Sequence, residues 1–79
     1  MSDWKEQNDH LEREFTFENF GESMEFVLAV AGLAEEVDHH PDIDIRYDRV
    51  KLTLCTHEAG STVTDKDRDL AEAIDLLFS

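Results

Sequence analysis

Three histidines carry the reactive chemistry that this sequence offers. His39 and His40 stand side by side before Pro41, the only proline, in the run EEVDHHP, and His57 follows in the run CTHEAG. The ordinary pKa of histidine, about 6.5, allows imidazole to donate and accept protons near neutral pH. Clustered imidazoles also separate their pKa values, because a second positive charge beside the first is disfavoured. If the three rings meet, one can act as general acid while another acts as base.

A β-hairpin is the element expected to bring these rings together. Residues 43–47 and 50–54 alternate apolar and polar side chains, which predicts two strands joined by a tight turn at Asp48–Arg49. In this register His40 faces His57, and facing residues have Cβ atoms about 4.5–5.5 Å apart. Both histidines then lie on the face opposite the apolar set, which points toward the helices: Ile43, Ile45, Tyr47, Val50, Leu52 and Leu54.

Glu35 and Pro41 are expected to position His39. Pro41 should end the preceding helix, because the residue before a proline is pushed out of helical geometry. His39 then leaves the helix as His40 enters the hairpin. Glu35 lies one helical turn before His39, at the spacing that allows a hydrogen bond between them. We therefore expect Glu35 to orient the ring of His39.

Three other interpretations of these residues stay open. A metal site could use His39, His40, His57 and Cys55, but adjacent histidines rarely point at one ion, and the usual ligand spacings are absent. The histidines could also be solvated residues at the ends of helices and strands. Cys55 could be a nucleophile, although a lone cysteine is more often a small buried hydrophobe. We expect no metal at this site.

The surrounding elements can be placed by their periodicity. Residues 11–17, LEREFTF, alternate as a strand does, and residues 4–9 could be its partner strand. A helix is expected over residues 19–37 with Asn19 as N-cap, and a second helix begins at Thr64 in the run TDKD. This order predicts an α+β fold of one domain, residues 1–79. Its arrangement is a two-layer β(2)-α-β(2)-α, a four-stranded, mainly antiparallel sheet with both helices on one face.

The first helix is apolar around most of its girth, more than a helix covering one sheet needs. Its apolar side chains form two stripes along the helix. One stripe can cover the sheet, and the other predicts a homodimer or homotetramer in which helix 19–37 of a second subunit covers it. The alternative is that the N-terminal segment of the same chain covers the second stripe. The two stripes are Phe20, Met24, Val27, Ala31 and Ala34, and Phe26, Val30, Leu33 and Val37.

Charge restricts the partners of this chain. Its 79 residues include 20 acids and seven bases, for a net charge of −13, which excludes nucleic acid and anionic membranes as partners. The acids are spread along the chain, as expected for the solvated coat of a protein from a high-salt cytoplasm, although an ordinary acidic protein is the alternative. The single cysteine, Cys55, excludes an internal disulfide. With no apparent signal or membrane segment, a cytoplasmic location is expected.

The whole pattern resembles the signature of pterin-4a-carbinolamine dehydratases. The run Glu35-x-x-x-His39-His40-Pro41 matches it, followed at the family's spacing by Tyr47 and then His57. Further similar segments are REFTFENF, YDRVKLTLCTHEAG and VTDKDRDLAEAID, the last of which places the family's aspartate at Asp67. The resemblance runs from about Trp4 to the C-terminus. We expect two departures from the family: the absence of its N-terminal helix before that tryptophan, and a loop after His57 that is one residue longer.

The resemblance implies a function as well as a fold. Family members form dimers and tetramers with the central helix in the interface, and they dehydrate 4a-hydroxytetrahydropterin to quinonoid dihydropterin without a metal or organic cofactor. It implies that His57 and His39 are the acid/base pair, that His40 positions the pterin, and that Glu35 orients a histidine. The implied pterin contacts are His39, His40, Pro41, Thr56, His57, Glu58 and Ala59.

Two alternatives of function remain at this point. Some relatives serve as a dimerisation cofactor of a transcription factor or in Rubisco assembly, so the chain could be a non-enzymatic assembly module. A pterin-handling role linked to molybdopterin metabolism is the other. A pure scaffold has no need for His39, His40 and His57 together, which favours the enzyme.

Overall fold

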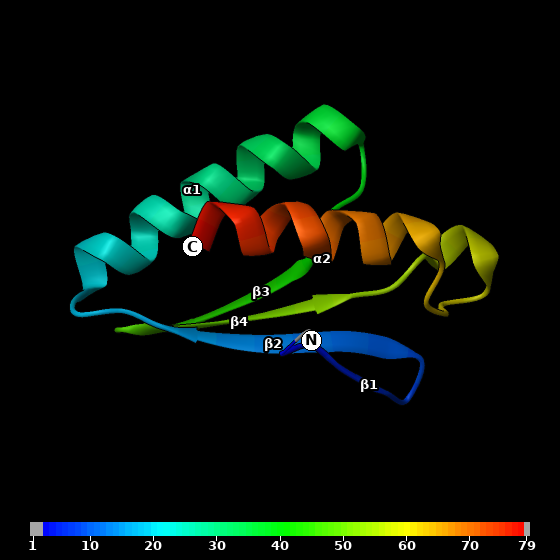
Figure 1. Ribbon diagram of the computed structural model, residues 1–79, viewed down its shortest axis with the longest axis horizontal. Helices are drawn as coiled ribbons and strands as arrows, with labels where there is room; N and C mark the ends of the chain where they lie inside the picture. Colours follow the sequence, from blue (N-terminus) through cyan, green and yellow to red (C-terminus); the bar gives the residue numbers. More distant parts are fainter. Residues whose placement is uncertain (1–2, 79) are drawn as a thin grey trace.

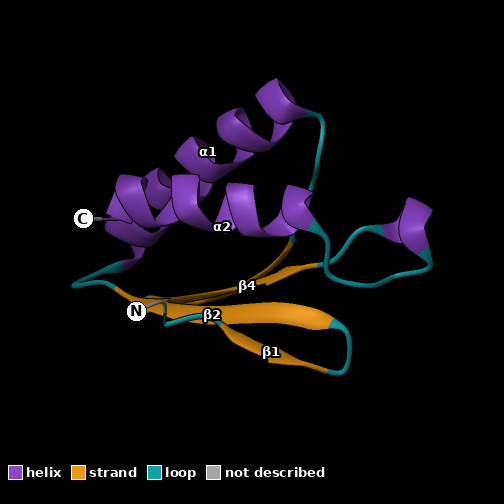
Figure 2. Ribbon diagram, turned by 45° about the vertical axis from the view of Figure 1, so that its right-hand side comes forward, coloured by secondary structure: helices purple, strands orange, loops and turns teal. Residues whose placement is uncertain are grey.

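The computed structural model describes residues 3–78 and has a sheet layer and a helix layer. The four strands pair antiparallel in the order β1-β2-β4-β3, and both helices lie on one face of the sheet (Figures 1 and 2). The predicted fold class and element order are thus confirmed. The elements are β1 (Lys5–Gln7), β2 (His10–Thr16), α1 (Phe20–Val37), β3 (Asp42–Arg46), β4 (Arg49–Leu54), the 3₁₀ helix η1 (His57–Ala59) and α2 (Asp65–Phe78).

Strand alternation produces the core. On β2, Leu11 and Phe15 point to the helices and are 7% and 1% exposed, while Glu14 between them is exposed. Each of them pairs with an apolar residue of the central strand β4, Leu11 with Leu54 and Phe15 with Val50. The buried core also contains Leu52, Phe26, Val27, Val30, Leu70, Ala71 and Ile74. Within residues 3–78, neither helix is long and apolar enough to cross a membrane.

The β3–β4 hairpin has a different register from the predicted one. Tyr47 and Asp48 form the turn, with Tyr47 in the left-handed conformation at a φ of 54°, and Arg46 pairs with Arg49. Two distant contacts hold this turn: the Phe17 N–H donates to the Asp48 carbonyl over 2.7 Å, and the rings of Phe20 and Tyr47 stack. The ladder ends at the pair Asp42 and Thr53. The predicted opposition of His40 and His57 was therefore wrong.

The slip is by two residues, so the side chains that pair in the hairpin keep their predicted faces, whereas Tyr47, His40 and His57 lie outside the strands. Val50, Leu52 and Leu54 on the central strand are fully buried. Ile43 and Ile45 on the edge strand β3 remain 37% and 38% exposed. The apolar residues of both strands thus point to the predicted face of the sheet, but only those of the inner strand, β4, are fully buried.

Helix α1 begins as predicted and ends for a different reason. The Asn19 side chain accepts a hydrogen bond from the Glu22 N–H at 2.9 Å, which confirms it as N-cap. At the other end, Asp38 adopts the left-handed conformation (φ 54°), and the His39 N–H bonds the Ala34 carbonyl at 3.0 Å. This is a Schellman-type end. Pro41 therefore follows the helix but does not terminate it.

Replacing Asn19 by alanine removes this cap and should lower the free energy of unfolding by about 1 kcal/mol. Denaturant titration of both proteins at the same salt concentration measures the difference. Asn19→Ser is the matched control, because serine keeps a side-chain oxygen that can accept the Glu22 N–H. An equal loss in both variants would contradict the capping role of Asn19.

The stripe of α1 that is buried runs between the two predicted stripes. Phe26 and Val30 of one predicted set and Val27 and Ala34 of the other are buried, together with Ser23, which belongs to neither set. Phe20, Leu28 and Val37 remain 48%, 68% and 51% exposed. One face of the helix is enough to cover the sheet, so the apolar side chains outside that face stay in contact with solvent.

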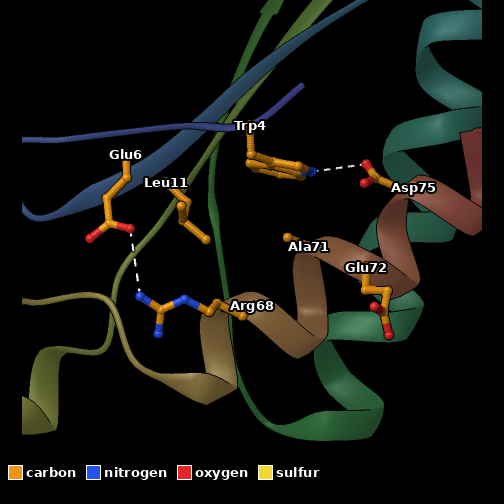
Figure 3. A pocket seen from close by; sticks show the side chains of 7 residues that line it. All are labelled: Trp4, Glu6, Leu11, Arg68, Ala71, Glu72 and Asp75. Atoms are coloured by element: carbon orange, nitrogen blue, oxygen red, sulfur yellow. Dashed lines mark hydrogen bonds and ion pairs between the residues drawn. The ribbon is translucent and has the colours of Figure 1, made fainter. Parts of the chain in front are cut away.

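Two side-chain contacts connect helix α2 to the N-terminal segment of the chain. The Trp4 indole N–H donates to Asp75 at 2.8 Å, and Arg68 pairs with Glu6 at 3.5 Å (Figure 3). Between these two contacts lies a hollow of about 340 Å³, floored by Leu11 and Ala71. No histidine lines this hollow. The candidate chemistry lies elsewhere, around the start of α2.

Candidate active site

His39 is the buried histidine of the site. The tight end of α1 turns the chain inward at this residue, and only 8% of its surface is exposed. Its Nε2 lies 2.6 Å from Oδ1 of Asp67, at the start of α2. The predicted hydrogen bond between the ring of His39 and the Glu35 carboxylate was therefore wrong. Glu35 has the i, i+4 spacing to His39, but the carboxylate that bonds the ring lies 28 residues further along the chain.

Asp67 is the only buried acid among residues 3–78, and all its carboxylate contacts are with donors. Oδ2 accepts the Thr56 hydroxyl at 2.7 Å and the Thr64 N–H at 2.9 Å. Burial alone would raise the pKa of Asp67. The hydrogen bonds from His39, Thr64 and Thr56 and the charge of His39 outweigh burial, so its pKa lies below its usual value. Asp67 is therefore ionised, and His39 must donate its Nε2 proton to it.

The prediction that Thr64 and Asp67 cap α2 is confirmed in part. The Asp67 carboxylate accepts the backbone N–H of Thr64, as an acid three residues into a helix does in a capping box. The Thr64 hydroxyl instead bonds the Thr56 hydroxyl at 2.6 Å. Sequence reasoning missed the second role of Asp67 as the partner of His39. Its position in the family signature was the one signal that could have indicated it.

Thr56 links this buried network to the segment that carries His57. Thr56 is buried, and its N–H donates to the Thr62 carbonyl at 2.8 Å, which closes the base of the loop. Inside the loop, η1 ends at Gly60 with a φ of 84°, a left-handed conformation that glycine adopts without a steric penalty. The loop therefore stands on a hydrogen-bonded base and holds Glu58 and Ala59 in solvent.

His57 is exposed at the start of this loop and has only weak partners. Its Nδ1 lies 3.4 Å from the Ser61 hydroxyl, and its Nε2 lies 3.9 Å from the sulfur of Cys55. Neither distance corresponds to a strong hydrogen bond. Its two ring nitrogens are therefore available to a bound molecule.

His40 and Glu35 form a separate, exposed pair. Nε2 of His40 lies 2.5 Å from a carboxylate oxygen of Glu35, and their side chains are 55% and 77% exposed. Glu35 thus orients a histidine, but the histidine is His40. Pro41, half-buried, carries the chain from this pair into β3. An exposed ion pair contributes little to stability, so its value would be in orienting the ring.

Cys55 is a buried free thiol. Burial raises its pKa, and the nearby carboxylates of Asp67 and Asp42 raise it further. A protonated thiol is a poor nucleophile and a poor metal ligand. Across residues 3–78, no group of three or more histidine, cysteine, aspartate or glutamate side chains is placed to hold a metal ion.

These contacts connect the two halves of the predicted site. The ring of His39 bonds Asp67, Asp67 bonds Thr56, and His57 is the next residue after Thr56. On the side of α2, His39 also lines a hollow of about 210 Å³, together with Val37, Lys66, Asp69, Leu70 and Ala73. His39 is thus a buried, oriented imidazole and His57 an exposed one, and His57 is connected to Asp67 only through the backbone of Thr56. Imidazole rings of both kinds can donate and accept protons.

Most of the chain matches the model of one protein family. The model of the family Pterin 4 alpha carbinolamine dehydratase matches residues 1–77, and the chain belongs to this family. A provisionally named pterin-4-alpha-carbinolamine dehydratase of Thermomicrobium roseum is 54% identical over 76 residues, which are 96% of this chain and 81% of that protein. One of the same provisional name from Sulfolobus acidocaldarius is 48% identical over 71 residues, 90% and 77% of the two chains.

Two solved structures share the fold. A transcriptional coactivator/pterin dehydratase from Brucella melitensis superposes with a TM-score of 0.88 at 32% identity, covering 94% of this chain and 80% of that one. A pterin dehydratase-like protein identified as a RuBisCO assembly factor in the alpha-carboxysome superposes with a TM-score of 0.82 at 28% identity, covering 96% and 89%. The fold is therefore similar both to a protein described as a pterin dehydratase and to one described as an assembly factor.

Proposed function

We propose that this protein dehydrates 4a-hydroxytetrahydropterin to quinonoid dihydropterin by general acid/base catalysis. The C4a–O bond breaks, and the hydroxyl leaves as water after it receives a proton. A base removes the proton of the ring N–H, and the electron pair forms the new double bond. The reaction gains and loses one proton and involves no oxidation, so two proton-transferring side chains are sufficient and no cofactor is needed.

The hydrogen bond between His39 and Asp67 is the observation that carries this proposal. Because Nε2 of His39 donates to the buried carboxylate, the remaining nitrogen, Nδ1, is the atom that exchanges a proton with the substrate. His57 is the second proton-transferring group, since its ring is exposed and only weakly bonded. Positioned acids and bases of this kind contribute about 10²–10⁴-fold to a rate.

The remaining site residues are assigned to binding. His40, oriented by Glu35, contacts and polarises the pterin, and Pro41 packs beside it. Backbone groups of Thr56, Glu58 and Ala59 in the loop around His57 read the polar edge of the ring. A polar site of this type rejects analogues that leave its donors and acceptors unpaired.

The test is the decay of the carbinolamine at high salt. A phenylalanine hydroxylase system generates the 4a-hydroxytetrahydropterin, and its disappearance is followed by ultraviolet absorbance with and without the protein. We expect an acceleration proportional to protein concentration. Uncatalysed decay in a sample shown to be folded would overturn the enzyme and favour the assembly module, which the likeness to the RuBisCO assembly factor supports.

We also propose that the protein is a homodimer or homotetramer through α1. The exposed side chains of Phe20, Leu28 and Val37 on this helix support the proposal, because so short a chain has little else to cover them. Leu28→Glu should shift the sedimentation coefficient toward that of the monomer. Leu76→Glu, at a comparably exposed position on α2, is the matched control. An unchanged sedimentation coefficient for Leu28→Glu would contradict the α1 interface.

We propose that the folded protein needs a high salt concentration for stability, because its surface is acidic. Of the 20 acids, only Asp67 is buried, so the net charge of −13 lies at the surface and repels itself. The screening length falls from about 10 Å at 0.1 M salt to about 3 Å at 1 M. We expect Tm to fall by several degrees when KCl is lowered from molar to 0.1 M, since about 1 kcal/mol moves Tm by about 4–8 °C at this size. A Tm no lower at 0.1 M would contradict the proposal.

A further inference from the structure

Basic side chains gather at one corner of the uncovered face of the sheet. Three of the seven bases, Arg46, Arg49 and Lys51, line a hollow of about 190 Å³ together with Glu14 and Asp44. The hollow lies at the end of the β3–β4 hairpin that carries the turn. Arg49 and Lys51 alternate along β4 with Val50 and Leu52, which are fully buried under the helices. These bases therefore point to the opposite face, into solvent.

The arrangement of these bases is unfavourable without a further partner. Arg46 and Arg49 are direct partners across the hairpin, and like charges placed opposite each other destabilise a strand pair. Their neutralisation within the chain is weak, although acids outnumber bases 20 to seven. Arg46 contacts Asp44 at 3.4 Å, with 73% of its side chain exposed, and Lys51 contacts Glu12 at 3.8 Å. Within residues 3–78 no ion pair is formed by Arg49.

We propose that Arg46, Arg49 and Lys51 form a binding site for a small oxyanion of the phosphate class. Two guanidinium groups present planar pairs of N–H donors that match such an anion, and the ammonium of Lys51 adds a point charge. The volume is below the roughly 300–1,000 Å³ of pockets for drug-sized ligands, so the hollow suits a small ion or the phosphate end of an ester.

The two carboxylates in the hollow limit its strength. Glu14 and Asp44 set two negative charges against three positive ones, leaving a local charge of +1 in a chain of −13. The dissociation constant is therefore expected to be in the millimolar range, on the order of 1 mM. None of the five residues belongs to the proposed active site, so this proposal does not depend on the dehydratase reaction.

The test is calorimetric titration of the intact protein with inorganic phosphate at constant ionic strength, balanced with KCl. We expect saturable binding that Arg49→Gln weakens at least about tenfold. Glu14→Gln should strengthen it several-fold, because a competing negative charge is removed. Lys5→Gln is the matched control: it removes the same charge from the same face of the sheet, two strands away in β1, and should leave binding unchanged. A parallel titration with glycerol phosphate distinguishes free phosphate from a phosphate ester as the ligand. Tighter binding of the ester would identify a phosphorylated metabolite.

Two results would overturn the proposal. One is the absence of saturable binding, or binding that Arg49→Gln and Lys5→Gln weaken equally, which would leave only the general effect of net charge. The other is a change in sedimentation coefficient in Arg49→Gln without phosphate binding by the parent protein, which would make the corner a contact between copies. Circular dichroism confirms that each variant is folded before it is titrated.

Discussion

Asp67→Asn is expected to lower the dehydration rate by at least about a hundredfold while the protein stays folded at high salt. Asparagine keeps the size of the side chain but removes the charge that holds the Nε2 proton of His39. The amide can present its own N–H to Nε2, which moves the ring proton to Nδ1, the atom assigned to proton exchange. The rate is measured in the carbinolamine assay, and circular dichroism measures folding.

The matched control is Asp65→Asn. Asp65 lies one position into the same helix, with 97% of its side chain exposed, so the variant loses the same charge without touching His39. A positioning role for Asp67 also predicts a changed pH–rate profile, because the Asp67 carboxylate no longer fixes the ring proton of His39 at Nε2. Equal rates and equal pH profiles for the two variants would contradict the account of Asp67.

The same substitution should change the acid limb of stability. The pKa of Asp67 in the folded protein lies below its usual value of 3.8, so the unfolded chain takes up this proton at a higher pH than the folded chain. The stability that ionised Asp67 contributes is present above the unfolded value and is lost as pH falls through the folded one. Urea titrations below pH 4 should therefore show a shallower loss of stability with falling pH in Asp67→Asn. Parallel curves for variant and parent would contradict the lowered pKa.

His57→Ala is expected to reduce the rate by about 10²–10⁴-fold with little effect on stability. The ring is exposed and only weakly bonded, so its removal costs few contacts, while the reaction loses one of its two proton-transferring groups. The rate comes from the carbinolamine assay and the stability from denaturant titration.

His10→Ala is the matched control for His57→Ala, because His10 lies on β2 and belongs to no part of the proposed site. His40→Ala should fall between the two, since the proposal assigns His40, paired with Glu35, to binding and not to proton transfer. Retention of most of the parent rate by His57→Ala would remove His57 from the mechanism.

Periodicity in the sequence was sufficient for the layers of this fold. The alternation of Leu11, Phe15, Val50, Leu52 and Leu54 with polar residues predicted which sheet face is buried, and Asn19 predicted the start of α1. A strand period of two is set by each residue and its immediate neighbours, so it can be read locally.

The register of the β3–β4 hairpin and the partner of His39 could not be predicted from local patterns, because both involve contacts between residues distant in the sequence. Neither candidate turn, Tyr47–Asp48 or Asp48–Arg49, has the Asn-Gly or Asp-Gly pair that a two-residue hairpin prefers. The turn that forms, at Tyr47–Asp48, is contacted by Phe17 and Phe20. The hydrogen-bond partner of His39 is likewise a residue that is distant in the sequence. Glu35 had the local spacing, but Asp67 is the acid that the fold buries against the ring. The resemblance to a known family had already marked Asp67, although without its role.

Dehydration by the pair His39 and His57 is tested by the rate of carbinolamine decay with the parent protein and with His39→Ala, both shown to be folded in molar KCl. We expect the parent protein to accelerate the loss of water and the variant to lose about two orders of magnitude or more of this acceleration. Decay at the uncatalysed rate with the parent protein, or equal acceleration by both, would contradict acid/base dehydration by the pair His39 and His57.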